Sequence, residues 1–292
     1  MKKIFFTTIL FAVLGINAAA QEMGAAMPFV SIDRNPATSA MAGTQATSAL
    51  FNPAAVPFSN GDVVFSFQNW TPGKEKHFNL LAALPCSKSF GLYAIGAYQA
   101  GQAYTIYTDA GKAKGSFTPS DILAGLGMGI AFSEHLSMGI KGAFVMQALA
   151  EDAKYNAFYA DAFLLYHSAK VNASAGISAI GSKVKSGDAA YALPTVIKAG
   201  ADYTPIEGLK LALDADYYLS LGFAASIGAE YAYKDMIFAR AGYHIGTGKT
   251  PIPSHLGLGA GFKWKGIHLD VSFLTASQTL GNTLNIGLGY SF

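Results

Sequence analysis

The sequence predicts an all-β fold, a transmembrane antiparallel β-barrel of about fourteen strands with an N-terminal segment that plugs its lumen. Charged residues make up only 13% of the 292 residues, about half the share usual for soluble domains, while hydrophobic residues reach 51%. Beyond the N-terminus, no apolar run approaches the roughly 18 residues of a membrane-spanning helix. Apolar residues instead recur at every second position, as in strands that meet lipid on one face only.

The first twenty residues predict a secretory signal peptide. Lys2 and Lys3 precede the apolar run IFFTTILFAVLGI, and the small residues Ala18 and Ala20 form a cleavage signal, so we expect cleavage near Ala20. An anchoring helix is the alternative, but the run is shorter than the roughly 20 residues that a span needs. The single cysteine, Cys86, excludes an intramolecular disulfide framework.

Residues 21–61 show no alternation and are rich in Ala, Ser, Pro and Gly. They contain too few large apolar residues for a core of their own. A wide barrel leaves space inside, so we expect this segment to be a hatch or plug within the lumen. A disordered leader is the alternative.

Residues 62–292 form the predicted barrel. Leu284, Ile286 and Leu288 alternate with small or polar residues, and Asp214 and Asp216 occupy one face of a strand whose other face is apolar. Strands with lipid outside and polar packing inside have this pattern. The predicted strands are 62–70, 77–85, 89–99, 121–132, 136–148, 156–167, 170–181, 193–204, 209–221, 223–233, 236–246, 255–265, 267–275 and 283–292.

Long and short connections alternate along the chain, as outside loops and periplasmic turns do in outer-membrane barrels. This places the C-terminus in the periplasm and the longest loop, 101–120, outside.

Aromatic residues on the outward faces fall at the predicted periplasmic ends of the strands, where an interfacial girdle belongs. They are Phe132, Tyr166, Tyr203, Tyr233, Trp264, Tyr290 and Phe292. Tyr290 and Phe292 are also the predicted signal for the barrel assembly machinery. A soluble barrel is the alternative, but fourteen strands would enclose an interior too wide for side chains to fill.

Two short motifs in the N-terminal segment resemble a known family. SAMAG (Ser39 to Gly43) and FNPAAV (Phe51 to Val56), the latter just before the first strand, are similar to the FadL superfamily of outer-membrane transporters. The resemblance implies fourteen strands and an N-terminal hatch that ends in an Asn-Pro-Ala motif, here Asn52, Pro53 and Ala54. Length and motif arrangement are most similar to PorV/PorQ-like proteins, some of which serve type IX secretion. This chain departs from them in having one Gly after Met41 and no acidic pair before the motif.

No residue set predicts catalysis, a cofactor or a metal. GTGKT (Gly246 to Thr250) lacks the first glycine of a phosphate-binding loop and is followed by PIP where a helix should begin. GLGMG and GLGAG place their glycines at alternate positions of strands, which predicts close packing against the plug or curvature of the sheet, and not a dinucleotide site. The six histidines have no metal-ligand spacing.

A charged patch is predicted on the lumen side of the C-terminal strands. We interpret it as a network of paired charges that holds the plug, with a polar lining for a solute path as the alternative. Its members are Asp214, Asp216, Glu230, Arg240, His244, Lys263, His268 and Asp270.

The sequence therefore predicts a non-enzymatic protein of a Gram-negative type outer membrane. As a PorV/PorQ-like protein it would hold a secretion-complex subunit or cargo protein through its outer loops. As a FadL-like transporter, the alternative, it would carry a hydrophobic small molecule. In either case we expect the binding surface in the longest loop, at Tyr104, Ile106, Tyr107 and Phe117. Membrane lipid is an expected partner, and the net charge of +2 gives no argument for nucleic acid.

Overall fold

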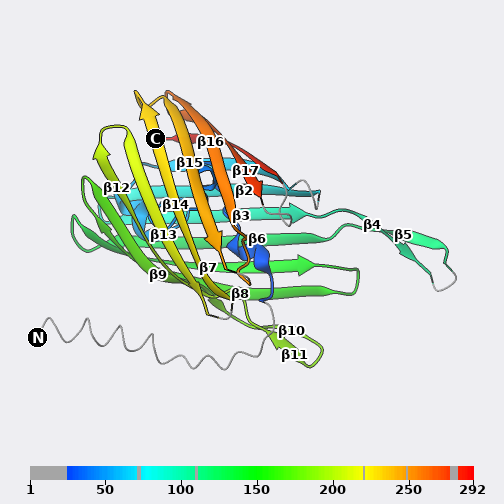
Figure 1. The fold of residues 1–292 in the computed structure, drawn as a ribbon. Coiled ribbons are helices and arrows are strands. Elements are labelled where there is room, and N and C mark those ends of the chain that lie inside the picture. The colour runs from blue at the N-terminus through cyan, green and yellow to red at the C-terminus, as the bar shows by residue number, and fades with distance from the viewer. Residues whose placement is uncertain (1–24, 71–73, 109–110, 220, 248, 277–281) are drawn as a thin grey trace, which may run out of the picture.

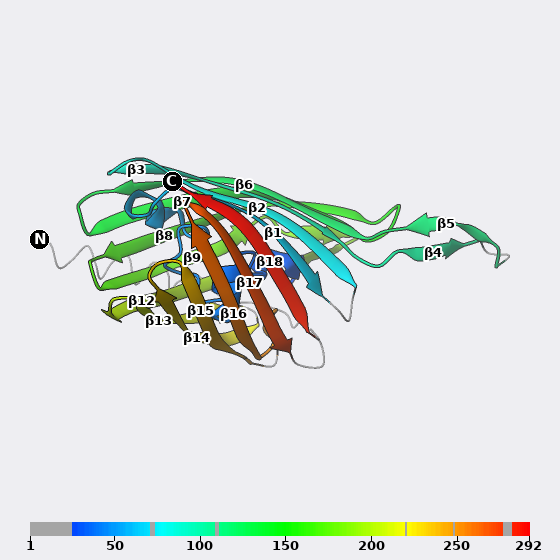
Figure 2. The same cartoon turned by 90° about the horizontal axis from the view of Figure 1, so that it is seen from above.

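The computed structural model describes residues 25–70, 74–108, 111–219, 221–247, 249–276 and 282–292. Fourteen strands form one closed barrel (Figures 1 and 2), and every neighbouring pair is antiparallel, which confirms the predicted fold class. Closure comes from the last strand, which pairs with both the first and the penultimate one. The barrel strands are β1 (Asp62–Trp70), β2 (Glu75–Ser87), β3 (Phe90–Ala100), β6 (Ser120–Ala131), β7 (Leu136–Ala148), β8 (Lys154–His167), β9 (Val171–Gly181), β12 (Val196–Ile206), β13 (Leu209–Tyr218), β14 (Gly222–Tyr233), β15 (Ile237–Gly246), β16 (His255–Trp264), β17 (Ile267–Ala276) and β18 (Thr283–Ser291).

Strand boundaries follow the alternation closely. β1 and β7 begin and end at the predicted residues, and most other ends differ by one or two positions. The largest differences are of three residues: β13 ends at Tyr218 where 221 was predicted, and β12 begins at Val196 where 193 was predicted. The Thr195 N–H donates to the Leu193 carbonyl, and this local bond, at a proline, keeps residues 193–195 out of the sheet.

Two hairpins in the connecting loops were not predicted. They are β4 (Tyr104–Tyr107) with β5 (Ala113–Phe117), and β10 (Val184–Ser186) with β11 (Ala189–Tyr191). Figures 1 and 2 show the β4–β5 hairpin projecting beyond the barrel at the end opposite the C-terminus. That end is called the far end below. Most residues of this hairpin are exposed on both faces, so burial imposes no alternating pattern that the sequence could show.

Side chains alternate around the barrel wall. In β18, Leu284, Ile286 and Leu288 are exposed on the outer face, whereas Thr283 and Asn285 are buried on the inner face. All seven aromatic residues predicted for the girdle have exposed side chains. No helix in the described residues has the length and hydropathy to cross a membrane.

The described part of the N-terminal segment, residues 25–61, packs against the inner faces of the strands. It contains η1 (Pro28–Ser31), α2 (Pro36–Ala40) and η2 (Pro53–Phe58). The helix α2 contacts β15 to β18, and η2 contacts the wall from β2 to β8. Glycines make this approach possible: a Cβ at Gly139 would collide with the Ala54 backbone, and one at Gly257 would meet the Ser39 carbonyl. The close packing predicted for GLGMG and GLGAG is confirmed at Gly129, which faces Pro53, and at Gly259, which faces Ala40.

Candidate functional site in the barrel lumen

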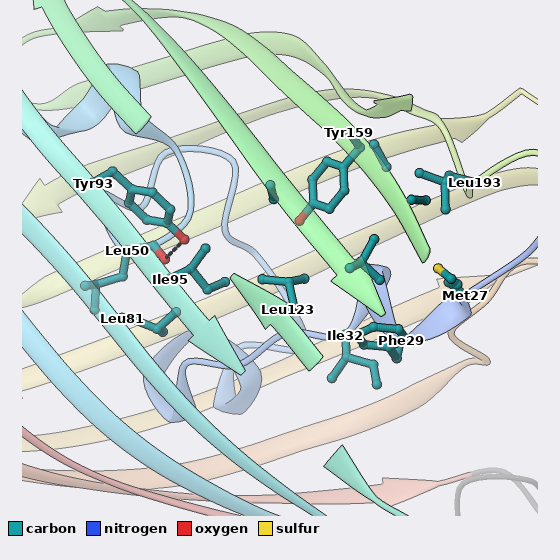
Figure 3. Close-up of a cluster of buried hydrophobic side chains, with 14 of the residues drawn as sticks. Met27, Phe29, Ile32, Leu50, Leu81, Tyr93, Ile95, Leu123, Tyr159 and Leu193 are labelled. Carbon is teal, nitrogen blue, oxygen red and sulfur yellow. Dashed lines mark hydrogen bonds between the residues drawn. The ribbon is translucent and has the colours of Figure 1, made fainter. Parts of the chain in front are cut away.

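The lumen has one apolar wall. Large buried side chains from β2, β3 and β6, such as Leu81, Tyr93 and Leu123, face the N-terminal segment and form a core with Phe29 and Ile32 (Figure 3). In the same cluster the Tyr93 hydroxyl donates to the Leu50 carbonyl at 3.2 Å. Burial of this apolar surface contributes on the order of 25 cal/mol per Å² to the attachment of the segment.

The Asn-Pro-Ala motif is a fully buried anchor. Asn52 is 0% exposed and caps η2, accepting a bond from Ala54 N at 2.9 Å. Its amide nitrogen donates to the Ala46 carbonyl at 2.7 Å and to the Ser174 hydroxyl of β9 at 2.8 Å. The Ser137 hydroxyl of β7 donates to the Ala54 carbonyl at 2.6 Å. Pro53 occupies the first helical position, where its missing N–H costs nothing. The motif therefore joins η2 to two strands.

Asp214 holds the middle of the segment. Its Oδ2 accepts the N–H groups of Gln45 and Ala46 at 2.8 and 2.9 Å. The ammonium of Lys198 lies 3.5 Å from the same oxygen and 2.7 Å from an oxygen of Asp216. The predicted pair Asp214 and Asp216 thus shares a lysine, and the first of the two carboxylates binds the segment directly.

Two buried lysines flank one aromatic ring of the segment. Lys141 and Lys198 place their ammonium groups 5.1 and 5.7 Å from the Phe51 ring centroid, within cation–π range. Lys141 also pairs with Asp161 at 2.6 Å, and both side chains are buried. Our sequence analysis did not find either lysine. The available signal for Lys141 was a single charge at an inward position of β7, whereas β12 carries two inward charges, Lys198 and Asp202.

Four of the remaining predicted residues, Glu230, Arg240, His268 and Asp270, form a second network near the end of the barrel that holds the C-terminus. Arg240 binds both Glu230 and Asp270. The ring nitrogens of His268 lie 2.8 Å from Asp270 and 2.9 Å from Asp62 of β1. No described hydrogen bond or ion pair joins this network to residues 25–60, so its members pair with one another across the wall.

Two predicted residues lie outside both networks. His244 stacks on His255 with ring centroids 5.1 Å apart, and Ser226 shares a 2.8 Å hydrogen bond with its Nδ1. The Lys263 side chain is half-buried, and none of the ion pairs in the described part of the chain includes it.

A cavity of about 80 Å³ opens beside the segment in the far half of the lumen. The wall residues Trp70, Tyr218 and Thr283 line it, and Phe51 and Asp33 line it from the segment. Apolar lining comes from Val30, Ile32, Val196, Ile252 and Leu274, and polar lining from Gln45, Gln68, Lys198, Asp216, His244 and His255. The cavity is therefore amphipathic.

Asp33 is the titratable group that the segment itself brings to the cavity. Its Oδ1 accepts bonds from Asn35 N at 3.1 Å and the Thr38 hydroxyl at 2.9 Å. Burial raises the pKa of the Asp33 carboxyl to about 6, and these hydrogen bonds oppose the rise. Charge at this position therefore changes close to neutral pH.

The predicted outer-loop surface is separate from the cavity. Tyr104, Ile106, Tyr107 and Phe117 all lie on the β4–β5 hairpin, and none of them lines the cavity. Tyr104 packs against Phe117 with ring centroids 5.8 Å apart and donates its hydroxyl to the Leu149 carbonyl at 3.1 Å. Among the described residues, no group of three or more His, Cys, Asp or Glu side chains is placed to hold a metal ion.

Comparison with known proteins adds the class of fold. No family model and no curated protein matches the sequence. The Pseudomonas putida toluene transporter TodX aligns over 93% of this chain and 99% of its own, with a TM-score of 0.60 and 14% identity. The Ralstonia pickettii toluene transporter TbuX covers 90% and 98%, with a TM-score of 0.61 and 12% identity. A Pseudomonas aeruginosa FadL homologue covers 92% and 100%, with a TM-score of 0.61 and 11% identity.

These likenesses show that the chain has the fourteen-stranded barrel fold of FadL-type outer-membrane transporters. The resemblance to the FadL superfamily is thus confirmed at the level of fold. None of the three structures supports the finer similarity to PorV/PorQ-like proteins, and the secretion role that it implied gains no support from them. The two short motifs that suggested this subfamily are explained by packing, since Asn52 caps η2 and the residues around Gly43 run close to wall glycines.

Proposed function

We propose that this protein is a non-enzymatic outer-membrane channel for small hydrophobic molecules. The observation that carries the proposal is a closed barrel whose lumen holds a separate segment beside an amphipathic cavity. Structures named as toluene transporters share this barrel over nearly their whole length. The proposal adopts the alternative interpretation from the sequence. It includes export by a signal peptide cleaved near Ala20, which lies outside the described residues.

The N-terminal segment serves as the movable hatch of this channel. In the described structure, one backbone hydrogen bond, from Ala26 N to the Ala192 carbonyl, joins residues 25–60 to the rest of the chain. Side-chain bonds, such as those of Asp214 and Asn52, make the other polar attachments. The hatch can therefore leave its position without breaking any strand pairing of the barrel.

The experiment measures initial uptake of radiolabelled toluene by intact Gram-negative cells that express the protein. A disulfide between Met41→Cys and Gly228→Cys would fix the hatch to β14, in a background where Cys86→Ser removes the native thiol. A Cβ built on Gly228 lies 2.5 Å from the Met41 Cβ. An increase of about 1 Å in this distance brings it into the range of a disulfide.

We expect the oxidised pair to reduce uptake to that of cells without the protein, and reductant to restore it. Single-cysteine variants are the controls for the oxidant. Uptake no faster than in cells without the protein, in either redox state, would contradict the channel function. Equal uptake by the cross-linked and reduced forms would contradict only the role of the hatch.

A second candidate function is the holding of a protein partner by the β4–β5 hairpin. The observation in its favour is the exposure of Tyr104 and Tyr107 on a hairpin that projects beyond the barrel. Deleting residues 104–117 tests it. A channel without a docked partner keeps its toluene uptake after this deletion, whereas a partner-dependent protein loses both a stoichiometric copurifying chain and its function.

A further inference from the structure

Three residues that line the cavity carry buried polar atoms without partners. Asp33 Oδ2, Gln68 Oε1 and Trp70 Nε1 are shielded from solvent and make no hydrogen bond in the structure, and all three residues line the cavity. The Gln68 side chain is only 2% exposed, so water cannot satisfy it from outside. An unpaired buried polar atom is costly, and a ligand that pairs with it gains that difference in affinity.

The three residues lie close to one another. Gln68 and Trp70 are two positions apart on β1, so they share its inner face. The Gln68 amide nitrogen donates to the Asp33 carbonyl at 2.6 Å, which brings the third residue to the same place. The Trp70 ring stacks on His77 with ring centroids 5.0 Å apart, which fixes the indole in position.

We propose that this cavity binds the hydroxyl group of a neutral amphiphile, such as a small aromatic or alicyclic alcohol. A hydroxyl both donates and accepts. The unpaired acceptor at Gln68 Oε1 and the unpaired donor at Trp70 Nε1–H match these two capacities. Neighbouring apolar residues, among them Ile32 and Phe51, receive the hydrocarbon body. The inference rests on the proposed channel function and names the class of solute for it.

The charges around the cavity disfavour an anionic head group. Lys198 is the cavity's lysine, and its ammonium already lies 2.7 and 3.5 Å from Asp216 and Asp214. Two carboxylates therefore face one ammonium, and Asp33 adds a third acidic side chain. A ligand carboxylate in this cavity would meet this surplus of negative groups, and the lysine among the residues that line the cavity is already paired with acids.

The size of the cavity restricts the body of the ligand. A dry cavity of about 150 Å³ holds benzene in another protein, and the cavity here measures about 80 Å³. A one-ring ligand must therefore displace a side chain of the segment. Phe51 and Ile32 are the apolar segment residues that line both this cavity and a smaller one of about 20 Å³ behind it, so their movement joins the two spaces.

The test is isothermal titration of the purified full-length protein in detergent with phenol, toluene and benzoate. Phenol and toluene differ by a hydroxyl in place of a methyl group, and titrations into protein-free micelles correct for partition. Gln68→Leu removes the acceptor, and Trp70→Phe removes the donor while keeping a ring. Gln99→Leu is the matched control, because Gln99 Oε1 is also buried and unpaired but does not line this cavity.

We expect phenol to bind at least tenfold more tightly than toluene, the effect of about one additional buried hydrogen bond. Gln68→Leu and Trp70→Phe should each weaken phenol binding by about tenfold and change toluene binding by less than twofold. Gln99→Leu should leave both unchanged. Far-UV circular dichroism and heat-modifiable migration on gels establish that each variant is folded.

Equal binding of toluene and phenol, tighter binding of benzoate, or unchanged phenol binding in both folded variants would overturn the assignment. Absence of binding by all three probes would overturn it as well. Toluene uptake by intact cells is measured separately. Normal uptake together with any of these results leaves the channel function standing without its hydroxyl site, whereas absent uptake removes the channel function.

Discussion

Removing the Asn52 side chain should release the hatch from the wall while leaving the barrel intact. Asn52→Ala removes three buried hydrogen bonds: one to Ser174 of the wall, of 2.8 Å, and two within the hatch, to Ala46 and Ala54, of 2.7 and 2.9 Å. Each bond contributes about 1 kcal/mol, so the docked state should lose about 3 kcal/mol. The strands keep their own pairing, so the loss is confined to residues 25–61.

Native-state hydrogen exchange measured by mass spectrometry is the assay. A loss of about 3 kcal/mol corresponds to a fall in protection on the order of 100-fold when exchange follows the opening equilibrium. The fall should appear in peptides that contain the Ala46 and Ala54 amides. Peptides from the centres of β7 and β14 should keep their wild-type protection.

Two single substitutions calibrate the result. Ser174→Ala removes one of the three bonds and should lower protection by about fivefold, the effect of about 1 kcal/mol. Asn285→Ala removes a lumen asparagine that donates one long hydrogen bond, of 3.3 Å, to Ser39 of the hatch, and should have a smaller effect than Asn52→Ala. Protection in Asn52→Ala that falls no further than in Ser174→Ala would refute the anchor. An equal fall in the barrel strands would show that Asn52 stabilises the whole protein instead.

Three further predictions concern other parts of the lumen and the chain end. The pKa of the Asp33 carboxyl is raised from 3.8 to about 6, so the docked hatch favours the neutral form of this group. Docking is therefore strongest below about pH 4 and weakens as the pH rises through 6. Exchange protection of the hatch, corrected for intrinsic rates, should therefore be lower at pH 8 than at pH 5, and Asp33→Asn should remove this dependence. Lys141→Met leaves Asp161 buried without its partner and should lower the free energy of unfolding in urea by about 3–5 kcal/mol. Adding Asp161→Leu should recover most of this loss. No recovery would mean that the lysine acts mainly through its aromatic contacts. Deleting Phe292 should lower the amount of assembled barrel at the cell surface, and normal levels of the truncated chain would contradict a terminal assembly signal.

Much of the barrel was predictable because lipid and lumen impose opposite demands on alternate residues. β7 and β18 show this clearly, since nearly every second side chain of each strand is exposed and apolar. The β4–β5 hairpin could not be found in this way, because most of its residues are exposed on both faces and have no such constraint.

The lumen was predictable only in part, because its contacts depend on register and on the path of the hatch. Asp214 and Asp216 stood out as neighbouring acids on one face, but their partner Lys198 comes from β12, and only strand pairing places it beside Asp216. The unpaired atoms of Gln68 and Trp70 have no sequence signature. β1 alternates poorly, and the cavity beside it exists because the hatch leaves that part of the lumen unfilled.

The junction of the two chain ends has a consequence for the order of folding. Phe292 N donates to the Gly61 carbonyl at 2.9 Å, at the point where the hatch leads into β1. Pairing β18 with β1 joins residues more than 200 positions apart, so it carries a large loop-closure entropy and belongs to the slow, late contacts of folding. Because the hatch precedes β1 and lies inside the ring, this last pairing also encloses it. The rate of ring closure therefore sets the time in which the hatch can enter the lumen through the open side of the sheet, between β1 and β18.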